Sequence, residues 1–274
     1  MRSEAAQRAN VRLRIGVGVG VAVGFALAAG TELHPREVAA LPLFLVFFPA
    51  LAWAQLPLLE EETLERIPVY IGSILSISLL GALAFALGVW GYEAEALGLV
   101  GLPVADFLLW TAGLTLGAIG LTAPLDLFER RVRGGPHPIL LELLPRTARE
   151  KEVFAGLSFT AGWGEEIAYR GYLPAALLLL VADPWLAMAV AGVAFGLLHS
   201  YQGGFGVVRT TLIGFLLGIP VVVTGSILPS MAAHFAIDLV AGFILGPRIL
   251  READRSEEEG VPSEPPEPPT DLTP

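Results

Sequence analysis

The chain has 274 residues, of which 54% are apolar and only 16% charged, and its mean hydropathy is +0.65. A soluble domain has fewer apolar and more charged residues, and a disordered chain needs low hydrophobicity, so both classes are excluded. The absence of cysteine excludes a disulfide framework, a cysteine-ligated zinc site and a thiol nucleophile.

The net charge of −10 is concentrated in the last 24 residues. Residues 251–274 carry eight acids and two arginines, which leaves −4 for the other 250 residues. Such a balance argues against nucleic acid as a partner. The same segment is rich in proline and glutamate, so we predict a disordered acidic tail over residues 251–274.

Eight segments are apolar and long enough to span a bilayer as helices, which needs about 20 residues. The candidate spans are 15–31, 38–59, 68–92, 104–122, 152–181, 185–201, 207–224 and 227–246. The first is too long for the apolar region of a signal peptide, and a second span follows after six residues. The fifth is too long for one straight helix and contains Gly162, Gly164, Gly171 and Pro174, so we expect it to be bent or broken. The sequence therefore predicts an all-α, polytopic membrane protein whose partner is the lipid bilayer.

The predicted spans divide the chain into five parts. We predict a cytoplasmic N-terminus over 1–14, four transmembrane helices over 15–122, and a cytoplasmic linker with a short interfacial helix over 123–150. A second membrane core occupies 151–246, and the tail follows.

The distribution of basic residues predicts how the chain is oriented in the membrane. With the N-terminus in the cytoplasm, 14 of the 17 arginines and lysines lie on the cytoplasmic side. Only Arg36 lies outside, while Arg170 and Arg209 fall within spans. Cytoplasmic loops of membrane proteins are enriched in these residues, so we expect a multi-pass protein of the cell membrane with both termini in the cytoplasm.

Ionisable residues inside the spans are concentrated in the C-terminal half, and the four N-terminal spans contain only Asp106, near one end. An ionisable group at mid-bilayer is unfavourable by about 2.5–3.5 kcal/mol, and each one therefore needs a reason. Six of those in the C-terminal half are Glu165, Glu166, Arg170, His199, His234 and Asp238. Each pair alone could be a structural contact between helices, but six such groups in three spans indicate a functional site.

The spacing of these residues assigns different environments to them. Glu166 and Arg170 are four residues apart with the acid first, which favours an ion pair. Glu165 is rotated by about 100° from that face and lacks a local partner, so it is suited to general acid/base chemistry. His234 and Asp238 have the same spacing, which lets Asp238 orient the imidazole.

Three motifs carry these residues in order. They are Glu165-Glu166-Ile-Ala-Tyr-Arg170, which fits EExxxR; Phe195-Gly-Leu-Leu-His199, which fits FxxxH; and His234-Phe-Ala-Ile-Asp238, which fits HxxxN/D. Their order and separation over residues 150–246 resemble the CPBP family of CAAX proteases and bacteriocin-processing enzymes, which contains the type II CAAX prenyl endopeptidases. On this resemblance, residues 151–246 are a CPBP-like catalytic membrane core.

The resemblance implies an intramembrane glutamic endopeptidase that hydrolyses a membrane-anchored protein or peptide. In that family the first glutamate and the FxxxH histidine activate water, which here are Glu165 and His199. The third motif stabilises the oxyanion, here through His234 and Asp238, while Glu166, Arg170 and Phe195 give structural support. Asp238 stands where asparagine is commoner, and only its protonated form can donate to an oxyanion.

Three alternatives are considered on the sequence: a metal site, a non-catalytic protein and a transporter. No cofactor is expected, but two glutamates and two histidines could ligate Zn²⁺, although no HExxH helix is present. A non-catalytic scaffold or immunity protein on the same fold is the alternative function. A proton-coupled transporter would also use intramembrane glutamate and histidine, but no internal repeat is found.

Overall fold

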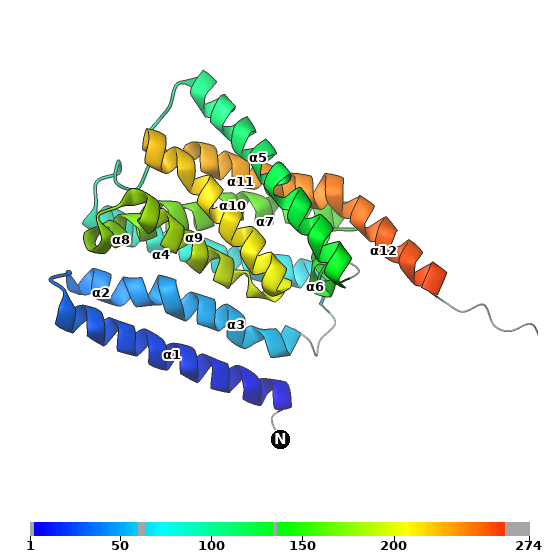
Figure 1. The fold of residues 1–274 in the computed structure, drawn as a ribbon, viewed down its shortest axis with the longest axis horizontal. Helices are drawn as coiled ribbons and strands as arrows, with labels where there is room; N and C mark the ends of the chain where they lie inside the picture. The colour runs from blue at the N-terminus through cyan, green and yellow to red at the C-terminus, as the bar shows by residue number, and fades with distance from the viewer. Residues whose placement is uncertain (1–2, 60–63, 134–135, 261–274) are drawn as a thin grey trace, which may run out of the picture.

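The structure is a computed structural model that describes residues 3–59, 64–133 and 136–260. Every regular element in these ranges is a helix, as predicted. The helices form one layered bundle in which α1 to α3 lie along one side and α5 and α12 along another (Figure 1). The elements are α1 (Glu4–Gly30), α2 (Pro35–Pro42), η1 (Leu43–Phe47), α3 (Phe48–Leu59), α4 (Arg66–Gly91), α5 (Val104–Arg133), α6 (Pro138–Leu143), α7 (Ala148–Glu166), η2 (Ile167–Tyr172), α8 (Leu173–Val181), α9 (Pro184–Leu198), η3 (Ser200–Gln202), α10 (Gly203–Thr224), α11 (Leu228–Leu239), η4 (Val240–Leu245) and α12 (Gly246–Gly260).

Several helices begin at residues whose side chains cap them. The Thr147 side chain accepts from the backbone N–H of Glu150, and the Glu150 carboxylate accepts in return from the N–H of Thr147. This capping box starts α7. The backbone donors of Thr147 and Arg146 hold the pKa of Glu150 below its ordinary value. Asp183 caps α9 in a similar way, with Pro184 in the first turn.

The predicted fifth span is a continuous helical segment with a changed pitch in its middle. Helix α7 passes into a π-helix, η2, directly after Glu166, and α8 follows without a break. All residues from Gly164 to Leu177 are buried, so this segment lies at the centre of the bundle. Residues of α7 pack against α4 and α11, and residues of α8 and η2 pack against α9.

Glycines allow the closest of these contacts. A Cβ atom placed on Gly81 of α4 would lie 2.6 Å from the Cα atom of Gly164. A Cβ atom on Gly162 would lie 2.8 Å from the carbonyl oxygen of Met231 on α11. Both distances are too short for real atoms, so the backbones of α4, α7 and α11 approach as closely as they do only because these residues lack side chains.

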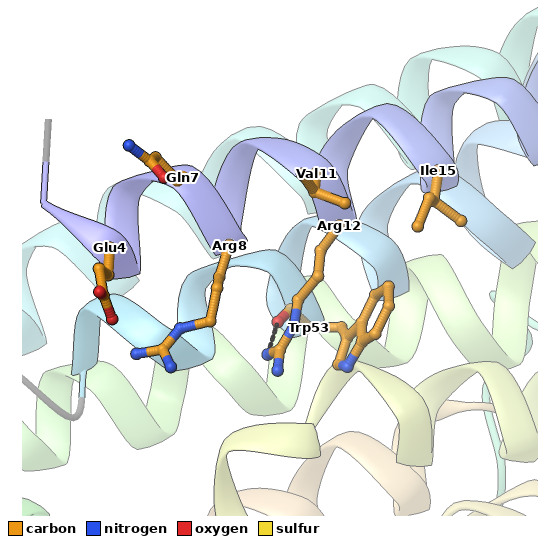
Figure 2. Close-up of a pocket in the computed structure, with 7 residues that line it drawn as sticks. All are labelled: Glu4, Gln7, Arg8, Val11, Arg12, Ile15 and Trp53. Atoms are coloured by element: carbon orange, nitrogen blue, oxygen red, sulfur yellow. Dashed lines mark hydrogen bonds between the residues drawn. The ribbon is translucent and has the colours of Figure 1, made fainter.

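Helix α1 is joined to α3 at its first turns. The Arg12 guanidinium donates to the backbone carbonyl of Trp53 over 3.1 Å and lies 4.9 Å from the centre of its ring (Figure 2). Further along, Gly16 contacts Ala50. This hairpin in turn contacts α9 and η3 through α3, so it covers one side of the central helices.

Three predicted boundaries differ from the structure. Helix α1 begins at Glu4, within the segment predicted as a cytoplasmic N-terminus, because Ser3 caps it. Helix α5 continues to Arg133, past the predicted end of the fourth span, and the short helix expected in the linker is α6. Residues 251–260 are helical in α12 rather than disordered, and the rest of the predicted tail lies outside the described residues.

Within the described residues, six helical segments are long and apolar enough to cross a membrane. They are Glu4–Gly30, Pro35–Leu59, Arg66–Gly91, Val104–Arg133, Ser200–Thr224 and Leu228–Arg255. The shorter α9 and the central α7–η2–α8 segment add two more, which gives the eight segments predicted. Large apolar side chains are exposed on the outer helices, such as Phe25 and Leu79 at 73% each. A bilayer would cover such surfaces.

Candidate active site

The ion pair predicted within EExxxR is present at the centre of the bundle. Arg170 Nη1 lies 2.9 Å from Glu166 Oε1, and both side chains are at most 1% exposed. Arg170 also donates from Nε to the carbonyl oxygen of Gly214 on α10 over 3.2 Å. Its guanidinium carbon lies 4.1 Å from the centre of the Phe195 ring on α9. The arginine therefore joins the central segment to two neighbouring helices.

Glu166 binds His234 as well as Arg170. His234 Nδ1 lies 2.8 Å from Glu166 Oε1. Because the carboxylate is also paired with Arg170, it is the ionised acceptor, and His234 donates through Nδ1–H. This contact corrects the sequence-based interpretation, in which Asp238 orients the imidazole. The two residues lie 68 positions apart, so spacing along one helix could not reveal the contact.

The second nitrogen of His234 faces two other carboxylates. Nε2 lies 3.8 Å from Glu165 Oε2 and 4.0 Å from Asp238 Oδ1. Both separations exceed hydrogen-bonding distance, so neither acid is bonded to Nε2. Glu165 and Glu166 therefore meet the same imidazole at different nitrogens, although the sequence predicts that they face apart. The side chain of Asp238 is 31% exposed, whereas that of Glu165 is 7% exposed.

His199 lies just past the end of α9 and is held by its own helix. Its Nδ1 is 2.9 Å from the carbonyl oxygen of Phe195. A carbonyl oxygen only accepts, so Nδ1 carries the hydrogen and Nε2 of the neutral ring has a free lone pair.

Phe195 connects the two histidines. Its ring centre lies 4.6 Å from that of His199, as the spacing predicts, and 6.0 Å from that of His234. Because Phe195 also contacts Arg170, the three motifs converge on one ring. The fold thus brings together Glu165, Glu166, Arg170, Phe195, His199, His234 and Asp238, which were predicted as one set.

A polar chain that spacing did not reveal reaches the loop after His199. Arg209 Nη1 lies 2.7 Å from Asp126 Oδ1 on α5, and Arg209 Nη2 donates to Gln202 Oε1 over 3.2 Å. Gln202 then donates to the hydroxyl of Tyr201 over 3.1 Å. The Tyr201 ring lies 5.8 Å from that of His199. These contacts anchor η3 and with it the position of His199.

The start of α11 is fixed to the loop between α4 and α5. The Ser226 hydroxyl donates to the carbonyl oxygen of Val100 over 2.6 Å. The backbone N–H of Ile227 donates to the carbonyl oxygen of Gly98 over 2.8 Å. These bonds set the position at which α11 begins. They therefore help to place His234 beside Glu166.

The acidic and histidine side chains of the bundle are the groups that could bind a metal ion. Across 3–59, 64–133 and 136–260, no group of three or more His, Asp or Glu side chains is placed to hold a metal ion. Nδ1 of His234 is bonded to Glu166, so only Nε2 of this residue could bind a metal ion.

Residues 152–240 match a family model described as type II CAAX prenyl endopeptidase Rce1-like. The match confirms the resemblance to the CPBP family for this segment, which contains every predicted site residue. No match to the chain is found among the curated proteins or the solved structures. The family supports a protease in general, and together with the apolar helices it supports a multi-pass membrane protein.

Proposed function

We propose that the Rce1-like segment makes this chain an intramembrane endopeptidase of the glutamic type, acting on a membrane-anchored protein or peptide. The observation that carries the proposal is the convergence of three motifs on His234 and Phe195, inside helices that are otherwise apolar. Glu165 lies 3.8 Å from His234 Nε2 without a hydrogen bond to it. A scaffold has no need of a buried acid in this position.

Glu165 and His199 activate the water. The carboxylate of Glu165 takes a proton from a water molecule, and the lone pair on His199 Nε2 accepts a hydrogen bond or a proton from the same molecule. The oxygen of the water forms a bond to the carbonyl carbon of the substrate. The peptide C–N bond then breaks, and the proton passes to the leaving amine. Support for the role of His199 comes from its Nδ1 contact with Phe195, which fixes the tautomer.

His234 and Asp238 face the oxyanion that forms on the substrate. The bond from Nδ1–H to the Glu166 carboxylate holds the imidazole in place, with Nε2 directed away from Glu166. Glu166 is therefore a positioning residue that acts through His234. Protonated Asp238 donates a second hydrogen bond to the oxyanion. The activity as proposed needs no metal.

The experiment is cleavage of a panel of membrane-anchored peptides by the purified full-length protein in liposomes, with products identified by mass spectrometry. Wild type is compared with Glu165→Gln and with the control Glu152→Gln, which replaces an exposed acid of the same helix. Each protein is assayed with and without a chelator. We expect cleavage by wild type and by the control, with or without the chelator, and none by Glu165→Gln.

Three results would contradict the proposal. Loss of cleavage on chelation with recovery on adding Zn²⁺ would indicate a metalloprotease. A folded wild-type protein that cleaves no peptide of the panel would favour the scaffold or immunity protein. Full activity of Glu165→Gln would place the base elsewhere.

A further inference from the structure

A second polar site lies outside the three motifs, at the end of the bundle where α1, α4 and α8 terminate (Figure 1). A pocket of about 540 Å³ is formed there by the turn between α1 and α2, the end of α4 and the end of α8. Its polar lining includes His34, Arg36, Glu37 and Tyr92, and its apolar lining includes Leu179. None of these residues takes part in the proposed proteolysis.

Glu37 is a buried acid in this pocket with one oxygen unused. Its side chain is 1% exposed. Oε1 accepts from Arg36 Nε over 2.7 Å and from the Tyr92 hydroxyl over 3.1 Å, and Arg36 Nη2 lies 2.6 Å from it. Oε2 is buried and has no hydrogen-bond partner among the described residues. Buried carboxylate oxygens are normally bonded, so a donor is expected at Oε2.

The neighbouring histidine does not supply that donor. His34 Nδ1 accepts from the backbone N–H of Arg36 over 3.3 Å, as the cap of α2. It is 4.0 Å from Glu37 Oε2, and its lone pair is already engaged. The hydrogen of the neutral ring is then on Nε2. The His34 side chain is 64% exposed, so this donor lies at the mouth of the pocket.

Arg36 provides a second donor beside His34. Nε and Nη2 are directed at Glu37, which leaves Nη1 outside these contacts. The guanidinium carbon lies 5.8 Å from the centre of the Trp90 ring and 5.5 Å from that of Tyr92. These contacts hold the arginine in position before any ligand arrives. The lining of the pocket thus offers a carboxylate acceptor and two N–H donors beside it.

The surroundings place this pocket at the surface of a bilayer. Trp90 and Trp185, at the ends of α4 and α9, are 73% and 43% exposed. Tryptophan is enriched where membrane helices meet the headgroups. Leu179 and Leu180, on the last turn of α8, are 55% and 39% exposed and continue the pocket as an apolar surface. A ligand for such a site has an N–H cation, an anionic group next to it, and hydrocarbon.

We propose that this pocket binds the phosphoethanolamine headgroup of a phospholipid. The ammonium group donates to Glu37 Oε2, and the phosphate accepts from Arg36 Nη1 and His34 Nε2. The acyl chains lie along Leu179 and Leu180. A choline headgroup carries the same charge but has no N–H to donate, so the site distinguishes the two.

The experiment measures lipid binding to the delipidated full-length protein by native mass spectrometry. The lipids are phosphatidylethanolamine, its N-methyl and N,N-dimethyl derivatives, and phosphatidylcholine, all with the same acyl chains. A hydrogen bond to a charged group changes binding by roughly tenfold to a hundredfold. We expect phosphatidylcholine to bind weaker by this factor, with the methylated lipids in between. Equal affinity for all four lipids in wild type would overturn the proposal without any variant.

Two variants and a soluble ligand sharpen the test. Glu37→Gln should lower phosphatidylethanolamine binding to the level of phosphatidylcholine. Glu95→Gln, which removes an exposed acid from the loop after α4, should not. Unchanged selectivity in folded Glu37→Gln would contradict the assignment. Soluble phosphoethanolamine has the headgroup without the chains, and we expect it to bind more weakly. Binding as tight as that of the lipid would identify a small-molecule site instead.

Discussion

The outer helices and the central helix of this molecule differ in burial and in the surroundings of their side chains. In α1 only Ala5 and Gly16 are buried, whereas every residue from Gly164 to Leu177 is buried. The outer helices are apolar because lipid surrounds them, and their side chains make few internal contacts. The central segment is surrounded by protein, so it can carry Glu165, Glu166 and Arg170. In this protein the ionisable side chains lie where other helices, and not lipid, surround them.

Among substitutions other than those of the two glutamates, the largest effect is expected at His199, at the edge of the central region. His199→Asn keeps a side-chain donor for the Phe195 carbonyl but removes the Nε2 lone pair. We expect kcat to fall by about 10²–10⁴, the range for loss of a general base. The assay is cleavage of a membrane-anchored peptide, with thermal melting to establish folding. His137→Asn, a histidine outside the motifs, is the control, and an equal loss in both variants would argue against a specific role.

Arg170 tests whether the buried charges depend on one another. Arg170→Met leaves Glu166 without its cation, and loss of one partner of a buried pair destabilises by about 3–5 kcal/mol. We expect a large fall in melting temperature in detergent. Arg131→Met, on the exposed end of α5, should have almost no effect. Similar melting of the two variants would mean that the central pair does not stabilise the fold.

Asp238 tests which group supports His234. The structure gives the orienting contact to Glu166. In the proposed mechanism Asp238 is a donor to the oxyanion. Asp238→Ala should lose about 10²–10³ in kcat. Asp238→Asn should stay active and should lack the decline in rate that wild type shows as rising pH ionises Asp238. The measurement is the pH–rate profile of the three proteins, and an inactive but folded Asp238→Asn would exclude the donor role.

Substitution of glycines allows the packing of the central helix and of the outer helix α5 to be compared directly. Gly162→Ala forces a methyl group against Met231, and overpacking of this kind destabilises by about 1–3 kcal/mol. Gly113→Ala on α5 has no atom within 4 Å of the new carbon and should be neutral or slightly stabilising. Chemical denaturation of both variants measures the difference. Equal destabilisation would show that α5 is packed as tightly as the centre.

Hydropathy was sufficient to predict the lipid-facing helices, because a helix surrounded by lipid needs only apolar side chains. A spacing of four residues was sufficient to predict the Glu166–Arg170 pair and the Phe195–His199 contact, because the two partners of each lie on one helical segment. The bond between Glu166 and His234 joins α7 and α11, and no local spacing encodes it.

Arg209 is the clearest missed signal. It was found within a predicted span, where a charge needs a partner, but its partner Asp126 lay four residues past the predicted end of the fourth span, at 122. Helix α5 in fact continues through that position. Boundaries of helices are the least reliable part of a sequence prediction, and here a boundary hid an ion pair.

The account depends most on the division of roles between two adjacent glutamates. Glu165→Gln and Glu166→Gln change the same atoms one residue apart, so each controls for the other. Cleavage and detergent melting must be measured for both. We predict that Glu165→Gln stops cleavage and melts like wild type, and that Glu166→Gln melts at a much lower temperature because Arg170 and His234 lose their shared carboxylate. A Glu165→Gln protein that is folded and fully active would contradict the account.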